Sequence, residues 1–255
     1  MKRGIKLNIK KIPPKKGKDY AEVLFAGDVH LGAPNCYWDK FVDNVKYCLE
    51  NNIYFVGMGD LLECSLKDSV GDVYSQKLTP QEQVDLIIDT LSPLAKKNLI
   101  LGLHCGNHEL RIMKNTSLDV MGMISKTLGV TYLGYACWTL LKVNDINYRI
   151  YSTHGSAGSA LPHTKMKAAI EQSFYRDADL VAYAHVHDLI TCSIKKEYID
   201  IRNRVVREEK KHIVVTGHYL GYHDSYAEIK GYPPSKTGSP KVKFFANKKD
   251  IHISI

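Results

Sequence analysis

Apolar runs that stop at short polar segments recur along the chain. Four continuous apolar runs predict buried strands: 21–27, 53–59, 99–105 and 179–184. A hairpin is predicted where the segments 138–143 and 146–152 flank Asn144-Asp145, a pair typical of a tight turn. Loops at strand ends hold ligands in many α/β folds. The pattern therefore predicts a ligand site assembled from five loops, each of which follows a strand.

Helices are predicted between these strands. Their apolar spacing or capping residues place them at 39–51, from Pro80 onward, at 117–128 and at 164–176. Thr79 and Glu82 form a capping box with Pro80 at the first helical position. Pro93 is expected to kink or end this helix. From residue 190, short strand-like runs such as 212–217 alternate with charged segments. One domain with helix-covered sheets is the expected architecture.

Composition excludes several classes of protein. The 255 residues are 44% hydrophobic and 24% charged, as in ordinary globular proteins. No apolar run reaches the ~18 residues of a membrane span, and the basic N-terminus lacks the features of a signal peptide. The six scattered cysteines form no CxxC pair, which indicates reduced thiols and disfavours a thiolate zinc cluster. We expect a cytoplasmic protein without membrane association.

Charge divides the chain into three parts. Residues 1–18 hold eight basic residues and no acid, so we treat them as a basic N-terminal extension. The remaining residues, 19–255, are expected to form a single domain. Within it, residues 195–255 hold 13 basic and 7 acidic residues, and this part is a candidate for substrate contacts. The basic ends would attract a polyanion such as nucleic acid, although solubility explains them equally well.

The polar loops carry side chains that bind metal ions. They supply Asp28, His30, Asp60, Asn107, His108, His154, His185 and His187. Each residue alone has a structural explanation as a turn former, a helix cap or a core histidine. Asp-x-His and His-x-His, however, place two side chains on the same side of an extended segment. Carboxylate, imidazole and amide ligands together suit Mn²⁺, Fe or Zn²⁺.

The order of these motifs resembles the calcineurin-like metallophosphoesterase superfamily. The matching segments are DVH, GD, GNHE, THG and HVH, within residues 23–190. The resemblance implies an α/β (α+β) fold, a four-layer sandwich of two mixed β-sheets flanked by helices. It also implies a dimetal site at the strand-end loops, which activates a hydroxide for hydrolysis of phosphate esters.

The same resemblance implies roles for individual residues. One metal ion would be held by Asp28, His30, Asp60 and His187, and the second by Asp60, Asn107, His154 and His185. Mn²⁺ is the expected metal, with Fe and Zn²⁺ as alternatives. His108 would be the catalytic acid, and Glu63 would orient it, although a surface acid is an equal alternative for Glu63. Glu109 has no assigned chemistry.

Two departures from the family pattern concern the substrate. Cys64 stands where the Ser/Thr protein phosphatases carry a phosphate-gripping arginine, and Arg111 is a candidate substitute. Ala184 replaces the usual glycine of the last motif without removing a ligand. His163 and Lys165 are further candidates for substrate contacts. A late aromatic run is either a base-stacking surface or edge-strand tyrosines: Tyr219, Tyr222, His223, Tyr226 and Tyr232.

Three functions remain open at this level. The first is a phosphodiesterase that acts on nucleic acid or a nucleotide, because the short span from Asp28 to His187 leaves little room for an inserted cap domain over the site. The second is a phosphomonoesterase or protein phosphatase with the same centre. The third is a non-catalytic binding module of this fold.

Overall fold

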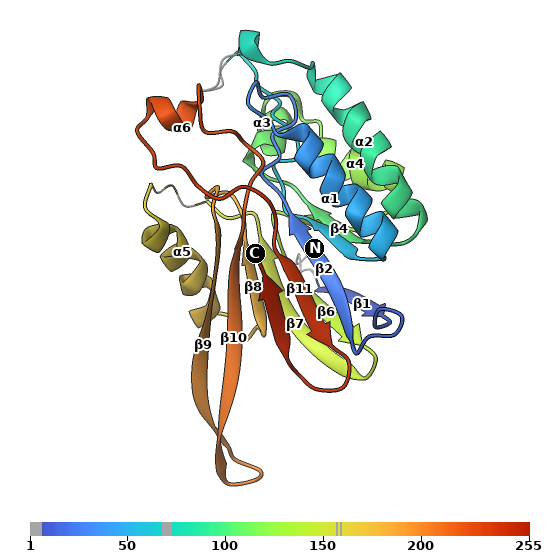
Figure 1. The fold of residues 1–255 in the computed structure, drawn as a ribbon, viewed down its shortest axis with the longest axis vertical. Helices are drawn as coiled ribbons and strands as arrows, with labels where there is room; N and C mark the ends of the chain where they lie inside the picture. The colour runs from blue at the N-terminus through green and yellow to red at the C-terminus, as the bar shows by residue number, and fades with distance from the viewer. Residues whose placement is uncertain (1–6, 68–72, 157, 159) are drawn as a thin grey trace.

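Two six-stranded sheets form the centre of the molecule (Figure 1). The computed structural model describes residues 7–67, 73–156, 158 and 160–255, without the side chains of Val73 and Tyr226. The β2 sheet has the strand order β12-β11-β2-β3-β4-β5. Its strands are β2 (Tyr20–Ala26), β3 (Tyr54–Gly57), β4 (Ile100–His104), β5 (Tyr132–Gly134), β11 (Lys241–Phe245) and β12 (Ile251–Ser254). Strands β2 to β5 are parallel, and β11 and β12 add an antiparallel edge.

The second sheet, named the β7 sheet, has the order β1-β6-β7-β8-β10-β9. Its strands are β1 (Leu7–Ile12), β6 (Ala136–Val143), β7 (Ile146–Thr153), β8 (Leu180–Tyr183), β9 (Leu189–Asp200) and β10 (Val205–Thr216). Parallel and antiparallel pairs are mixed within it. Strand β1 lies within the basic N-terminal segment and pairs with β6 in parallel.

Helices cover the outer faces of both sheets. Helices α1 (Trp38–Asn51), α2 (Pro80–Lys96), α3 (Asn107–Thr116) and α4 (Val120–Leu128) lie on the side of the β2 sheet, and α5 (Pro162–Phe174) packs on β8, β9 and β10. A short 3₁₀ turn, η1 (Val73–Ser75), and α6 (Tyr226–Ile229) complete the helices of the described chain. None of the helices in these ranges has the length and apolar character to cross a bilayer.

Three apolar cores hold the four layers together. The largest fills the space between the β2 sheet and its helices, around Phe41, Phe55 and Leu91. A second lies between the two sheets, where Phe25 of β2 and Leu180 of β8 belong to the same cluster. A third joins α5 to the β7 sheet. Burial of apolar side chains on both faces explains why the parallel strands read as continuous apolar runs in the sequence.

The predicted four-layer sandwich is confirmed, and the differences are local. Helix α2 does not end at Pro93 but continues to Lys96, because the proline removes a single hydrogen bond near the end and Leu94 remains fully buried in the core. Helix α3 begins within the GNHE segment, at Asn107, and the apolar pattern did not reveal it. The long hairpin of β9 and β10 extends past the body of the molecule (Figure 1).

Candidate metal centre

The five polar loops meet at one edge of the sandwich. Strands β2, β3 and β4 are parallel neighbours, so the loops after them leave the β2 sheet at the same end. Strands β7 and β8 are likewise parallel in the other sheet. Side chains from all five loops therefore come within a few ångströms of one another, as the sequence pattern predicts.

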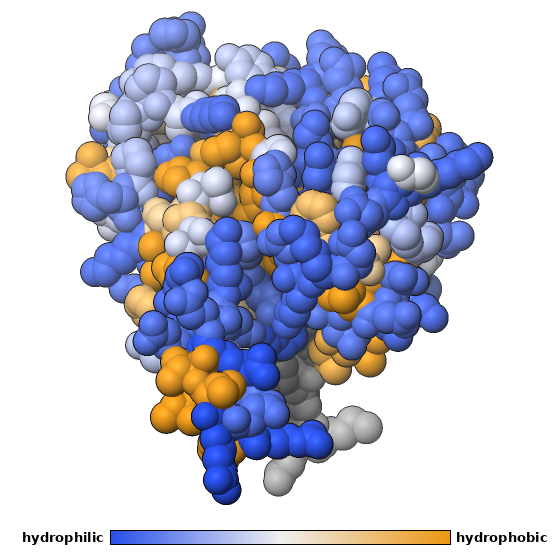
Figure 2. Space-filling view, turned by 60° about the horizontal axis from the view of Figure 1, so that its bottom comes forward, coloured by the Kyte–Doolittle hydropathy of each residue, from blue (hydrophilic) through white to orange (hydrophobic). Residues whose placement is uncertain are grey.

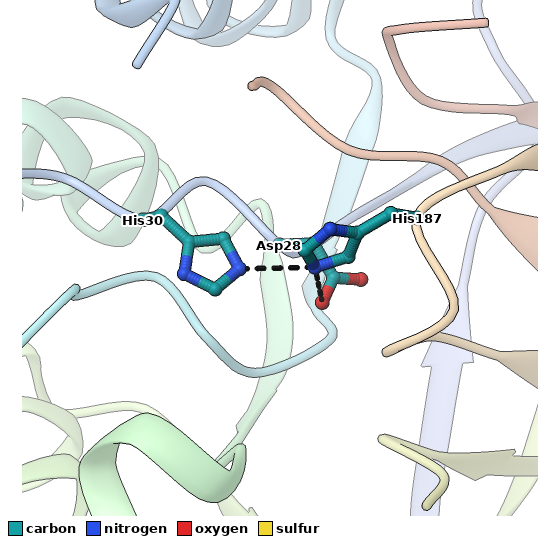
Figure 3. A group of neighbouring side chains, drawn as sticks. All are labelled: Asp28, His30 and His187. Atoms are coloured by element: carbon teal, nitrogen blue, oxygen red, sulfur yellow. Dashed lines mark hydrogen bonds and ion pairs between the residues drawn. The ribbon is translucent and has the colours of Figure 1, made fainter. Parts of the chain in front are cut away.

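One group of ligand-type side chains consists of Asp28, His30 and His187 (Figure 3). The Nε2 atoms of His30 and His187 lie 3.1 Å apart, and His187 Nε2 lies 3.4 Å from Asp28 Oδ1. Asp28 and His30 are buried, whereas the side chain of His187 is 35% exposed. The group therefore lies at the boundary between the interior and solvent.

A second group consists of Asp60, His154 and His185. His154 Nε2 lies 3.1 Å from Asp60 Oδ2 and 3.1 Å from the side-chain oxygen of Asn107. His154 and Asp60 are almost fully buried. The two groups share three members each with the two ligand sets expected from the sequence. A third group of ligand-type side chains joins His30 and Asp60 to His108.

The carboxylate of Asp60 lies between the two groups. Its Oδ2 atom is 3.1 Å from His154 Nε2 on one side and 3.9 Å from His30 Nε2 on the other. Its Oδ1 atom accepts a hydrogen bond from the backbone N–H of His108 at 2.9 Å, which holds the carboxylate in place. One side chain can thus contact two ions at once.

Hydrogen bonds behind the site orient the histidine rings. His154 donates from Nδ1 to the carbonyl oxygen of Met58, and His30 donates from Nδ1 to the carboxylate of Glu63. In the neutral rings, the Nε2 lone pairs then face the oxygens of Asp60 and Asn107 and the partner histidine. Lone pairs directed at one another repel unless a proton or a metal ion lies between them. This arrangement fits divalent cations bound by nitrogen and oxygen ligands.

Unpaired buried atoms and pKa shifts also indicate a site for divalent cations. Asp28 Oδ1 and His185 Nδ1 are buried and have no hydrogen-bond partner among the described residues. Burial alone would lower the pKa of His154, but the charge and hydrogen bond of Asp60, the charge of Asp28 and the hydrogen bond to Met58 together outweigh it and raise the pKa to about 10. For His30, burial also lowers the pKa, but the hydrogen bond that His30 donates to Glu63 and the charges of Glu63, Asp60 and Asp28 together outweigh it and raise the pKa to about 9. The cluster requires positive charge, which metal ions would supply.

The backbone at the ligands is unusual. Five of the seven expected ligands have positive φ angles in the left-handed region: Asp28 at 51°, His30 at 53°, Asp60 at 48°, His185 at 74° and His187 at 48°. This conformation is uncommon for residues with a Cβ atom and occurs mainly where function requires it. It turns consecutive side chains toward the same centre.

Two glycines allow the loops to approach each other closely. A Cβ on Gly106 would lie 2.0 Å from Asp60 Oδ1, and one on Gly59 would lie 2.8 Å from His154 Nδ1. Gly59 also has a φ of 89°. The glycines of the GD and GNHE segments are therefore required by the packing around Asp60.

His108 and Glu63 lie beside the metal ligands. His108 donates from Nδ1 to the backbone carbonyl of Glu63 at 2.7 Å, and the Glu63 carboxylate is 3.4 Å from the same nitrogen. That carboxylate is closer to His30, at 2.9 Å. Burial, followed by the charge of His30, lowers the pKa of His108 to about 4. Glu63 thus contacts both a candidate ligand and the candidate acid.

Glu109 joins the loops that carry the site. Its carboxylate is 2% exposed and accepts backbone hydrogen bonds from Asp60 at 3.1 Å, Leu62 at 3.1 Å and Gly106 at 2.7 Å. Burial and the nearby Asp60 raise its pKa to about 7. The sequence offered one sign of this role, since Glu109 is the third residue of a helix that begins after Gly106, a position where acids accept backbone N–H groups.

The candidate substrate residues lie in different surroundings. Arg111 reaches toward the carbonyl of Cys64 at 3.5 Å, beside the position where the family pattern has an arginine. Lys165 is buried, with its ammonium 3.3 Å from Asp188 and 3.4 Å from the carbonyl of His187, so it supports the last ligand loop. His163 is exposed in the first turn of α5.

The late aromatic run is not one surface. Tyr219 is fully buried, and its hydroxyl contacts Asn44 and Ser239, so this tyrosine belongs to the core. His218, which the sequence analysis did not select, stacks on His187 with ring centroids 5.3 Å apart and planes inclined by 14°. Tyr222 is half-buried and His223 is exposed. The side chain of Tyr226 lies outside the described residues.

Comparisons with known proteins give similarities of structure only. No protein-family model and no curated protein matches the sequence. A predicted phosphoesterase of Streptococcus pneumoniae is 11% identical, with coverage of 93% of this chain and 90% of that chain and a TM-score of 0.38. Wild-type Vps29 of Entamoeba histolytica, complexed with Zn²⁺, is 14% identical, with coverage of 91% and 97% and a TM-score of 0.40.

A metallophosphoesterase of Sphaerobacter thermophilus is 12% identical, with coverage of 92% of this chain and 88% of that chain and a TM-score of 0.37. At these identities and TM-scores, the activities of the three proteins do not transfer to this chain. The chain itself has the two mixed sheets, the flanking helices and the cluster of His and Asp at the strand ends that a calcineurin-like metallophosphoesterase fold implies.

Proposed function

We propose that the protein is a metal-dependent phosphoesterase. The position of Asp60 supports this proposal most directly, because its Oδ2 atom lies between two separate groups of ligand-type side chains. Two divalent ions held side by side by a shared carboxylate are typical of enzymes that cleave phosphate esters. Asp28, His30, Asp60 and His187 would hold one ion, and Asp60, Asn107, His154 and His185 the other.

When bound, the two ions would lower the pKa of a water molecule and neutralise charge on the phosphoryl oxygens. The chain's own residues orient the ligands and handle the proton. Glu63 and Met58 fix the tautomers of His30 and His154 through Nδ1. His108 donates from Nδ1 to Glu63, which leaves Nε2 on the side of Asp60. His108 would act from its imidazolium form, in which Nε2 also carries a proton. Nε2 would pass this proton to the leaving oxygen of the ester, and the ring would return to its neutral form with Nδ1–H still bonded to Glu63.

The substrate proposed is a phosphodiester of a nucleic acid or nucleotide. Cys64 is buried and its thiol cannot grip a phosphate, so the arginine-based recognition of protein phosphatases is missing at this position. Arg111 lies beside Cys64 and also lowers the pKa of His108 through its charge, so its guanidinium is near the catalytic face. Mn²⁺ is the proposed metal, and the six free thiols support a reducing compartment, the cytoplasm.

Turnover of bis-p-nitrophenyl phosphate with Mn²⁺ tests the proposal, with p-nitrophenyl phosphate as the monoester comparison. A diester rate well above the monoester rate is expected. Asp60→Asn serves as the inactive control, because it weakens the shared ligand without adding volume. Turnover of the monoester alone would favour a phosphomonoesterase. Absence of turnover on both, with two metal equivalents bound, would contradict the proposed activity.

A further inference from the structure

Strands β9 and β10 form an arm that leaves the body of the protein. Strand β10 pairs with β8 only from His212 to Val215, whereas its pairing with β9 runs from Val205 to Thr216. Among the described residues, residues 195–211 form strand pairs only between β9 and β10. Glu209 and Lys211 still contact the body, through Arg149 and the carbonyls of Ser173 and Arg176, so the free part of the arm lies beyond them. Figure 1 shows this part extending beyond both sheets. The outer end of this ribbon is anchored through the rest of the β7 sheet, and both of its faces are open to a partner.

The end of the arm combines exposed aliphatic side chains with arginines. Ile199 is 70% exposed, Ile201 85%, Val205 46% and Val206 68%. Figure 2 shows apolar and strongly hydrophilic residues side by side at the protruding tip. Burying four such side chains would stabilise a complex, because each removes apolar surface from water.

The tip of the arm carries positive charges that no acidic side chain among the described residues neutralises. Arg202 and Arg204 lie in the turn, are exposed, and make no ion pair or hydrogen bond with the described residues. Asp200, the nearest acid, is already engaged, since its carboxylate accepts from Asn203 and from Arg207, each at 2.7 Å. The turn thus presents two free guanidinium groups beside a neutralised acid.

We propose that this arm binds duplex DNA, with its tip in a groove. The major groove of B-form DNA admits a two-stranded β-ribbon, and proteins that enter the minor groove combine arginines with aliphatic wedges. The aliphatic residues lie on both faces of the ribbon, because Ile199 is directly opposite Val206 on one face while Val205 is opposite Asp200 on the other. Both walls of a groove would therefore be contacted.

Other partners fit the tip less well. Insertion into a lipid bilayer would bring Arg202 and Arg204 into the hydrocarbon first, at a high free-energy cost. Pairing with the arm of a second copy would place like-charged arginines together. A polyanion with a groove satisfies the arginines and the aliphatic side chains at the same time.

The length of the arm also sets a minimum length for a duplex substrate. This inference rests on the proposed function. Strand β9 begins directly after the ligand loop that ends at Asp188, and its 12 residues span roughly 40 Å at ~3.3 Å per residue. That length corresponds to about 12 base pairs at ~3.4 Å per pair. A duplex that contacts both the arm and the metal centre must be at least this long.

Fluorescence anisotropy with a labelled duplex of about 24 base pairs, in EDTA so that no cleavage occurs, tests the arm. The double variant Arg202→Gln/Arg204→Gln should bind about tenfold more weakly and reduce the slope of log K against log salt by about 2. Ile201→Ser should weaken binding without changing the slope. Lys46→Gln/Lys126→Gln, which removes two exposed charges on α1 and α4, is the charge-matched control and should bind as the wild type does.

Turnover of bis-p-nitrophenyl phosphate separates the arm from the metal centre. All tip variants should retain the wild-type rate, because a small diester does not reach the arm. Wild-type affinity in both tip variants, or an equal loss in the charge-matched control, would overturn the proposal. The proposal would also be overturned if the tip variants bound duplex DNA as the wild type does but lost binding to lipid vesicles in a sedimentation assay, or lost self-association in gel filtration. A wild-type protein that binds duplex but cleaves no diester would refute the proposed function and leave the arm proposal standing.

Discussion

Replacement of Glu109 by alanine should destabilise the protein far more than loss of an ordinary helix cap. Glu109 is only 2% exposed, and its carboxylate accepts three backbone N–H groups, from Asp60, Leu62 and Gly106. An unsatisfied buried N–H costs about 1–3 kcal/mol. Loss of three partners, partly offset by relief of the repulsion between Glu109 and Asp60, should lower the free energy of unfolding by about 3–6 kcal/mol.

Glu82→Ala is the matched control. Glu82 also occupies the third position of its helix and accepts the N–H of Thr79, but it is exposed, so water replaces the lost hydrogen bond. Urea unfolding followed by circular dichroism measures both variants, and Glu82→Ala should change stability much less. Metal content, measured by mass spectrometry, should fall in Glu109→Ala alone, because the loop that carries Asp60 loses its anchor. Equal changes in the two variants would refute this reasoning.

Three further predictions concern the metal centre itself. His108→Ala should lower turnover of bis-p-nitrophenyl phosphate by about 10²–10⁴-fold with normal metal content, and a parallel loss of metal would contradict its role as an acid. Asp60→Asn should reduce both bound equivalents, whereas Asp28→Asn should reduce one, as measured by metal analysis after gel filtration. Removal of metal with EDTA should lower the melting temperature, and Mn²⁺ at 100 times its dissociation constant should restore about 2.7 kcal/mol; an unchanged melting temperature would exclude metal binding by the folded protein.

Much of the fold could be predicted because the strands are buried on both faces. Continuous apolar runs such as 99–105 match β4, and the loops after such runs carry the ligand-type residues that the structure brings together. The resemblance gave Asn107 and His108 different roles, and these roles stay a prediction. The side-chain oxygen of Asn107 lies 3.1 Å from His154 Nε2, and His108 lies in a group of ligand-type side chains with His30 and Asp60.

Other features depend on contacts that no local pattern contains. The polar face of α3 conceals its helical period, because Glu109 is buried by hydrogen bonds to loops from elsewhere in the chain. The exposed outer half of β9 and β10 lacks the alternation of a strand over a core, so its length was not predicted. The contact of Lys165 with Asp188, 23 residues later, also depends on the fold and has no sign in the local sequence.

The left-handed backbone at five of the expected ligands lowers the stability of the fold at the positions that would bind metal. At each of these positions, glycine would adopt the same conformation without the cost of about 1 kcal/mol or more that a side chain imposes. The same side chains also make local contacts, since Asp60 accepts the N–H of His108 and Asp28 accepts the N–H of His185. The side chains at these positions still impose a cost on the metal-free fold, and binding of metal ions by these ligands would offset it.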